Sequence, residues 1–290
     1  MLLQSDFEYL RPRTVRDAIE LAQSRGATAV FLAGGTDLVL GMKREQRSPA
    51  SIIDIARVPE LHVLHVVDGY LRIGAAVTFA TIASSHLIRS HAPALAQAAA
   101  EVGSPQIRSI GTLGGNVATA SAAGDSLPAL VAHESDMLID GPSGARTDSV
   151  ASFLQDRAGA LQAGELIREI RVPVGKGRRG GAFIKLGRRN ALAVARVSAA
   201  LAVHWTSGGD IDTARLVLGA VAPAPLRVGE AERLIEEAGV EAEVRMEVAD
   251  LASMAVMRSI PGRASAAYKR RAVKSLVFEV MEKVSLDRPY

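Results

Sequence analysis

The 290-residue chain contains no cysteine. This absence excludes disulfide bonds, a zinc site with cysteine ligands, an iron–sulfur cluster held by this chain, and a thiol nucleophile. Aromatic residues are scarce, at 4%, and Trp205 is the single tryptophan. The sequence also lacks an apolar run of about 18 residues and the apolar core of a secretory signal, so we expect no membrane span. The absence of cysteine fits a cytoplasmic protein, which is the location we expect.

Charge of one sign is only slightly in excess, with 34 Lys and Arg against 31 Asp and Glu. Adjacent arginines occur only in short pairs, and no basic block stands out, so nucleic acid is not expected to be the main partner. The six histidines are scattered. His62 and His65 are close in sequence, but they precede a strand-like segment and no further ligand completes a metal-site pattern. We therefore predict no metal site.

Several common catalytic and nucleotide-binding patterns are also missing. The sequence has no P-loop, no G-x-G-x-x-G followed by a helix, no G-x-S-x-G and no H-E-x-x-H. It also shows no convincing Ser/His/Asp spacing. Neither a Rossmann site nor a nucleophile-based active site is supported.

Two glycine-rich segments stand out from this background. Residues 107–125 read IRSIGTLGGNVATASAAGD, and residues 33–38 read AGGTDL. Glycine tolerates positive φ and lets a backbone approach a ligand, while hydroxyl and amide side chains supply short hydrogen-bonding groups. The alternatives are a Gly/Ser surface loop for the first segment and a plain strand–helix turn for the second. Two such segments on separate α/β units, without a P-loop, fit a long ligand with a central pyrophosphate.

Hydrophobic periodicity and turn residues indicate an α+β chain. A Thr14/Asp17 capping box begins a helix over 14–26, and apolar strands over 27–32 and 51–55 suggest a small parallel unit. The following region has helices at 78–87, at 93–102 and after Asp125, which we expect to cap its helix, and strands at 70–75, 136–140, 145–147 and 165–172. Residues 174–181 resemble a linker. Strands at 182–187, 197–206 and 211–219 follow, the last two forming a hairpin, and then helices at 227–238, 243–257 and 264–284. The predicted domains are 1–57, 58–175 and 176–290.

The two glycine-rich segments resemble the flavin-adenine dinucleotide (FAD) motifs of the medium subunit of molybdenum hydroxylases. That family includes the flavoprotein subunits of carbon monoxide, bacterial xanthine and nicotinate dehydrogenases. The resemblance extends to LRIGAAVTFATI (71–82), ELIREIRVP (165–173) and FIKLGRRNALAVARVSAAL (183–201). It implies a fold of the vanillyl-alcohol-oxidase type. Two N-terminal α/β subdomains would hold FAD, and a C-terminal antiparallel sheet with a helix bundle would close over the flavin.

The resemblance also implies the cofactor-binding residues. One segment would wrap the pyrophosphate and ribityl chain with backbone N–H groups: Phe31, Leu32, Ala33, Gly34, Gly35, Thr36, Asp37 and Leu38. Thr112, Gly115, Asn116 and Thr119 would bind from the other side. Asp125 would accept a hydrogen bond from a ribose or ribityl hydroxyl, or else only cap a helix. Ile167 would pack on the adenine or the ring region. Lys185 would stand near the isoalloxazine and stabilise the anionic reduced flavin, or else be an exposed strand lysine. No residue of this chain is predicted to be catalytic or to bind a metal.

By this resemblance the chain is the electron-exit subunit of a molybdenum hydroxylase. A small iron–sulfur subunit and a large molybdopterin subunit would be its partners, in a dimer of heterotrimers. Electrons would leave to NAD, a quinone or O₂. The FAD is expected to be non-covalent, because neither motif contains a histidine or a cysteine for attachment. The lack of cysteine also excludes the members that carry an extra iron–sulfur insert in this subunit. Two alternatives remain open, namely a self-sufficient FAD-dependent oxidase and a flavin-free assembly subunit. The substrate of the molybdenum subunit is not specified.

Overall fold

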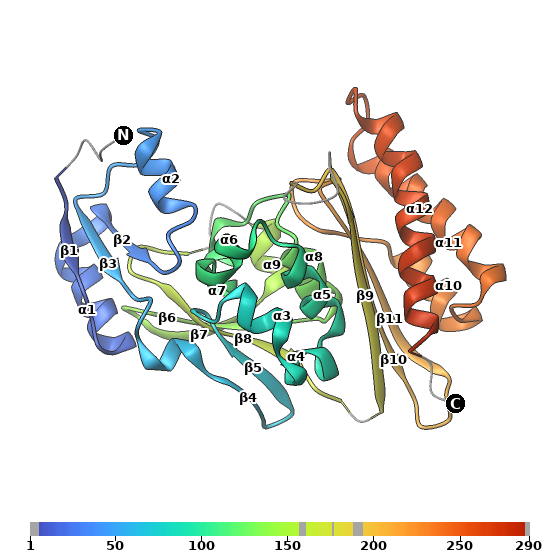
Figure 1. Cartoon of the computed structure of the whole chain (residues 1–290), viewed down its shortest axis with the longest axis horizontal. Coiled ribbons are helices and arrows are strands. Elements are labelled where there is room, and N and C mark those ends of the chain that lie inside the picture. Colours follow the sequence, from blue (N-terminus) through green and yellow to red (C-terminus); the bar gives the residue numbers. More distant parts are fainter. Residues whose placement is uncertain (1–5, 157–160, 176, 188–193, 288–290) are drawn as a thin grey trace.

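The computed structural model describes residues 6–156, 161–175, 177–187 and 194–287. The chain runs through an N-terminal unit, a middle unit and a C-terminal unit, arranged in that order along the long axis (Figure 1). Among the described residues, no helix is both long and apolar enough to cross a membrane.

The N-terminal unit is a small parallel sheet with strand order β1-β3-β2. It contains β1 (Glu8–Leu10), α1 (Val15–Arg25), a short 3₁₀ turn (Gly26–Thr28), β2 (Ala29–Leu32), α2 (Leu38–Lys43) and β3 (Ser51–Asp54). The predicted capping box is confirmed, since the side chains of Thr14 and Asp17 each accept a backbone N–H from the other residue. The predicted parallel pairing of β2 with β3 is also confirmed. Strand β1 was not predicted, because it has only three residues and no buried one.

The middle unit is an antiparallel sheet with strand order β4-β5-β8-β6-β7, covered on one face by short helices (Figure 1). The strands are β4 (Leu64–Val67), β5 (Tyr70–Gly74), β6 (Asp136–Gly141), β7 (Gly144–Ser149) and β8 (Leu166–Pro173). A 3₁₀ turn (Pro59–His62) precedes β4. The helices are α3 (Phe79–Ser84), α4 (His86–His91), α5 (Pro93–Glu101), α6 (Pro105–Ile110), α7 (Leu113–Thr119), α8 (Ser126–Ala132) and α9 (Val150–Gln155).

Two predictions for this unit need correction. The helix predicted over 78–87 is divided, because the Ser85 hydroxyl accepts the N–H of Ile88 and begins a new helix. The glycine-rich stretch is largely helical rather than a loop. Ser104 and Thr112 cap α6 and α7, and Pro105 occupies the first turn of α6, where its missing N–H costs nothing. Capping therefore prevailed over the high glycine content.

The C-terminal unit is an antiparallel sheet with strand order β12-β11-β10-β9, followed by long helices. The strands are β9 (Arg178–Leu186), β10 (Val197–Trp205), β11 (Ile211–Gly219) and β12 (Leu226–Arg227), and the helices are α10 (Gly229–Ala238), α11 (Ala242–Ser259) and α12 (Ala266–Ser285). The predicted hairpin and the final helices are confirmed. Strand β9 includes residues 178–181, which were predicted to belong to a linker.

This C-terminal sheet lies between two helical layers (Figure 1). Phe183, Ala200 and Val217 face the core of the middle unit, while Leu201 and Trp205 face α10, α11 and α12. Because alternate residues of a strand point to opposite faces, the near-continuous apolar pattern of β10 reflects burial on both sides. The sheet is thereby fixed against the middle unit, beside the helices that follow the glycine-rich stretch.

Candidate functional site

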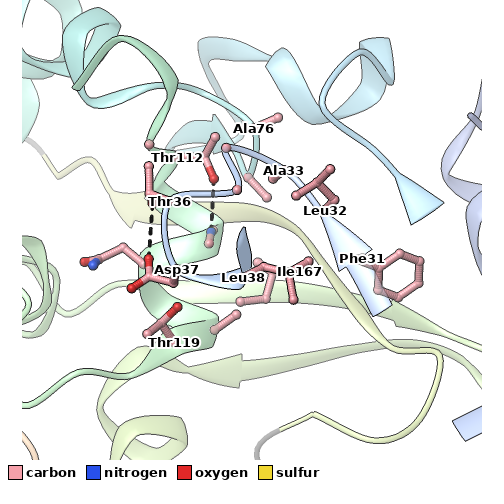
Figure 2. Close-up of a pocket in the computed structure, with 18 of the residues that line it drawn as sticks. Phe31, Leu32, Ala33, Thr36, Asp37, Leu38, Ala76, Thr112, Thr119 and Ile167 are labelled. Atoms are coloured by element: carbon pink, nitrogen blue, oxygen red, sulfur yellow. Dashed lines mark hydrogen bonds between the residues drawn. The ribbon is translucent and has the colours of Figure 1, made fainter. Parts of the chain in front are cut away.

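A cavity of about 400 Å³ is lined by residues of the N-terminal and middle units. Every residue of the segment 31–38 lines it, and so do Thr112, Gly115, Asn116, Thr119 and Ile167. Figure 2 shows several of these side chains, with Thr119 at the end of α7 and Thr112 at its N-cap. The structure therefore brings together all but two of the residues that the sequence suggested. Asp125 and Lys185 lie elsewhere.

The first wall of the cavity is the turn between β2 and α2. Gly35 has a φ of +70°, a conformation in which a side chain is strained. A Cβ on Gly34 would overlap the carbonyl of Ile110 at the end of α6. This close backbone contact is what joins the first motif to the second, and only glycine permits it. The Thr36 hydroxyl donates to Asp37 within the same turn, at 3.2 Å (Figure 2).

The second wall is the first turn of α7. The Thr112 hydroxyl accepts the N–H of Gly115 at 3.2 Å (Figure 2). A Cβ on Gly114 would lie 2.5 Å from the Cβ of Ala75, so this glycine is needed for packing. Apart from its chain neighbours and the backbone of its own helix, a Cβ on Gly115 would have only Thr112 Oγ1, at 2.9 Å, within 4 Å among the described residues. Gly115 thus exposes its backbone to the cavity.

One part of our interpretation of this stretch was wrong. We took its glycines as residues that supply positive φ. None of the four glycines has a positive φ: Gly111, Gly114, Gly115 and Gly124. They matter because they lack a side chain, which lets helices and strands approach closely. Positive φ is used in the first motif, at Gly35.

Further residues line the cavity that were not among those predicted to bind the cofactor, and four of them (Ile107, Gly111, Gly114 and Ala118) belong to the second motif. They are Arg47, Ile55, Ala75, Ala76, Phe79, Val102, Ile107, Gly111, Gly114, Ala118, Leu161, Glu165 and Leu166. Glu165 accepts Nε and a terminal nitrogen of Arg146 at 2.8 and 2.9 Å, and this bonding lowers the pKa of its carboxyl group. A sequence signal could have identified Glu165, since it is the first residue of the segment 165–173 that resembles the family. Nothing local indicates Arg47.

Asp125 and Lys185 form an ion pair between the middle and C-terminal units. Lys185 Nζ lies 2.7 Å from Asp125 Oδ2 and donates to the Glu101 carbonyl at 2.5 Å. Both charged side chains are only 8% exposed. Burial raises the pKa of Asp125 to about 6, although Lys185 opposes this shift. Asp125 Oδ1 is buried and has no hydrogen-bond partner among the described residues.

These contacts overturn three expectations. Asp125 precedes α8, but its side chain makes no capping hydrogen bond, so neither the predicted cap nor the cap-only alternative holds. The alternative of an exposed strand lysine is also wrong, because the Lys185 side chain is buried. At the start of α8, the N–H of Leu127 instead donates to the backbone carbonyl of Gly124.

Histidines and metal-ligand clusters do not contribute to the cavity. The described residues on its wall include no histidine, and the chain has no cysteine. Among the described residues, no group of three or more His, Cys, Asp or Glu side chains is placed to hold a metal ion. The His62 ring instead contacts the Ala56 carbonyl at 2.9 Å.

Two units that meet at a glycine-lined cavity, with a third unit packed behind, are typical of a protein that binds a dinucleotide cofactor. Residues 5–175 match the model of the FAD-binding domain in molybdopterin dehydrogenase. Residues 182–284 match that of the CO dehydrogenase flavoprotein C-terminal domain. The chain belongs to this family of FAD-binding medium subunits of molybdenum hydroxylases, and it is an oxidoreductase subunit.

Individual relatives match over most of the chain. The chain is 32% identical to the nicotinate dehydrogenase FAD-subunit of Eubacterium barkeri, over 93% of each chain. It is 33% identical to the carbon monoxide dehydrogenase medium chain of Hydrogenophaga pseudoflava, over 76% of this chain and 77% of the relative. A solved structure of carbon monoxide dehydrogenase from Hydrogenophaga pseudoflava, which lacks the Mo-pyranopterin moiety, has a chain that superposes with a TM-score of 0.89. That chain is 30% identical, and the match covers 100% of both chains.

Proposed function

We propose that this chain is the electron-transfer subunit of a molybdenum-containing hydroxylase or dehydrogenase. In this proposal it receives electrons from iron–sulfur clusters of a partner and passes them to NAD or another acceptor. The observation that carries the proposal is the meeting of both glycine motifs on one cavity, within a chain of the FAD-binding family. Bound FAD would supply the redox chemistry, while the protein binds the cofactor and sets its environment.

The residues of the cavity suit an extended FAD. Backbone N–H groups of 31–38 would hold the pyrophosphate and ribityl chain, and Gly115 leaves room for the ligand on the α7 side. Thr112, Asn116 and Thr119 would add contacts from that helix. Asn116 is itself fixed, because the Ser126 hydroxyl donates to its Oδ1 at 2.7 Å. Ile167 would pack on the adenine or the ring region.

The Asp125–Lys185 pair does not line the cavity, and we propose that the flavin end of the cofactor extends beyond the cavity to reach it. A lysine ammonium has three donors, and the two contacts to Asp125 and Glu101 leave one to face a ligand. A positive charge held there would stabilise negative charge on a reduced flavin. The unpartnered Asp125 Oδ1 would accept a hydrogen bond from a ribityl or ribose hydroxyl, which would satisfy a buried acceptor.

The proposed partners are those that membership of this family implies. Without cysteine this chain cannot ligate an iron–sulfur cluster, so a cluster that passes electrons to it would lie in another subunit. We propose a small iron–sulfur subunit and a large molybdopterin subunit, assembled as a dimer of heterotrimers in the cytoplasm. The names of the relatives support the presence of a larger and a smaller subunit, since several of them are medium chains.

Cofactor content tests the first part of the proposal. The purified chain should hold about one FAD, which acid or heat releases without proteolysis. The absence of histidine and cysteine from the described part of the cavity wall is the reason to expect a dissociable cofactor. Flavin that stays with the denatured protein, or FMN in the extract, would contradict the proposal. A purified chain without flavin absorbance that also fails to take up FAD would favour the assembly-subunit alternative.

Electron transfer needs a separate experiment. Under anaerobic conditions, purines, N-heterocycles, aldehydes or CO should leave the flavin band of the FAD-loaded chain unchanged. Reconstitution with both partner subunits should make the correct substrate bleach it. Bleaching of the isolated chain by any of these compounds would instead support the self-sufficient oxidase. Of the described residues on the cavity wall, only Phe31 and Phe79 are aromatic, which argues against a dedicated substrate pocket there.

A further inference from the structure

The cavity wall carries more acidic than basic side chains among the described residues. Among the described lining residues, those with charged side chains are Asp37, Glu165 and Arg47. The negative charge of Glu165 is balanced by the guanidinium group of Arg146, which donates two hydrogen bonds to it. Asp37 receives only the Thr36 hydroxyl among the hydrogen bonds described. A diphosphate is doubly ionised at neutral pH, so binding it beside Asp37 needs a positive charge as well as backbone N–H groups.

Arg47 supplies the positive charge on this part of the wall. Its side chain makes no ion pair with any carboxylate of the described residues, unlike Arg25, Arg146 or Arg215. It is exposed on one side and lines the cavity on the other. An arginine fork matches the geometry of phosphate oxygens and stays charged at any accessible pH.

The backbone holds Arg47 in this place through the turn that ends α2. Gln46 N–H donates to the Gly41 carbonyl at 2.9 Å, and Glu45 N–H donates to the Met42 carbonyl at 3.0 Å. Glu45, the donor of the second hydrogen bond, has a φ of +58°. These bonds form a Schellman motif, in which a left-handed residue reverses the chain at the end of a helix. The reversal returns the chain along α2.

The stem of Arg47 then lies over Gly41. A Cβ built on Gly41 would be 3.4 Å from Arg47 Cδ and 3.5 Å from its Cγ. Gly41 is one helical turn from Asp37, whose carbonyl accepts the Gly41 N–H at 2.9 Å. The stem is therefore within one turn of the glycine motif, and Arg47 lines the same cavity.

We propose that Arg47 binds the diphosphate of FAD and makes this site selective for FAD over flavins that lack a diphosphate. The inference rests on FAD binding by the cavity, and it adds a residue that neither glycine motif contains. Arg47 acts on binding alone, through charge and hydrogen bonds to phosphate oxygens. The turn at Glu45 and the missing side chain at Gly41 are the features that position it.

Affinity measurements on the flavin-free full chain test this role. Arg47→Gln should weaken FAD binding about tenfold, as expected for loss of a partly exposed charge-assisted contact. Riboflavin, which has no phosphate, should bind the variant and the wild type equally. The FAD dissociation constant of the wild type should rise with ionic strength, and this dependence should be weaker in the variant. Arg47→Lys should recover part of the affinity.

Two further variants separate the role from a general effect on folding. Arg44→Gln changes an exposed cation on the same turn that does not line the cavity, so FAD binding should be unaffected. Gly41→Leu keeps the guanidinium but fills the space under its stem, and it should weaken FAD without weakening riboflavin. Both changes should leave the melting temperature of the flavin-free chain close to that of the wild type or above it.

The outcomes are distinguishable. Wild-type FAD affinity in Arg47→Gln would overturn the proposal while leaving FAD binding itself intact. An equal loss of FAD and riboflavin would also overturn it, because the change would then act through the fold. If the wild-type chain bound no FAD at all, the proposed function would fail first, before any question about Arg47.

Discussion

Lys185 on β9 and Asp125 at the start of α8 form a buried ion pair, with 2.7 Å between Nζ and Oδ2. The two residues are 60 positions apart and belong to different units of the fold. The pair therefore fixes the C-terminal sheet against the middle unit at the end of β9, where the glycine-rich stretch of the middle unit ends. Removing one partner is costly, because the other charge is left buried without compensation.

Substitution of Asp125 should change how stability depends on pH. Its pKa in the folded chain is about 6, above its ordinary value of 3.8. The folded state therefore binds a proton that the unfolded state has released. This contribution to stability is fully present below the lower value and is lost as pH rises through the upper one. In Asp125→Asn, urea unfolding of the flavin-free chain should lack this downward slope. An unchanged slope would show that another group causes it.

Lys185→Met should destabilise the flavin-free chain strongly at neutral pH. The carboxylate of Asp125 would lose its cation in a buried setting, which costs about 3–5 kcal/mol in comparable cases. The loss should shrink near pH 5, where the carboxyl group takes up a proton. The double variant Asp125→Asn, Lys185→Met should be more stable than Lys185→Met alone. If Asp125→Asn changed the free energy of unfolding by the same amount in the wild type and in Lys185→Met, the two residues would not be coupled.

The neighbouring glycines of α7 should respond differently to added side chains. Gly115→Val should abolish FAD binding and leave the flavin-free fold largely intact, because the new side chain enters the cavity. Gly114→Ala should lower the free energy of unfolding by about 1–3 kcal/mol, because its Cβ would overlap Ala75. Gly124→Val, outside the cavity wall, should have a milder effect on FAD. Flavin content and thermal unfolding of the three variants test these differences, and wild-type flavin content in Gly115→Val would refute the placement of the ligand.

His133 should make the chain sensitive to acid. The ring is buried, and its Nε2 has no hydrogen-bond partner among the described residues. Burial, assisted by the charge of Arg179, lowers its pKa from 6.5 to about 3. Its contribution to stability is therefore present above the higher value and lost as pH falls towards the lower one, by at most about 1.4 kcal/mol per pH unit.

His133→Gln, which cannot gain a proton in this range, should flatten that acid slope. The measurement is the free energy of unfolding of the flavin-free chain at several pH values below neutral. His65→Gln serves as the control, because His65 is exposed on β4 and its loss should leave the slope unchanged. The Asp125 and His133 effects have opposite signs, so the two variants can be told apart in one set of titrations.

Local sequence determined most of the secondary structure. The capping box at Thr14 needs only residues three positions apart, and the hairpin over 197–219 needs only alternating strands and a turn. The two glycine motifs could be recognised as opposite walls of one site because their chemistry lies in short contiguous segments. The high alanine content of α5 indicates a buried helix, and its Ala94, Ala98 and Ala99 are fully buried.

The tertiary structure decided what depends on contacts between distant residues. Whether Gly34 is needed for a turn or for the approach of Ile110 depends on where α6 packs, which no local pattern encodes. The same holds for Lys185, which pairs with a residue of another unit, and for Arg47, which reaches the cavity only because the turn after α2 reverses the chain. Capping and periodicity act within a few residues along the chain. Burial, ion pairing and the shape of a cavity are set by the whole fold, and so they could be read only from the structure.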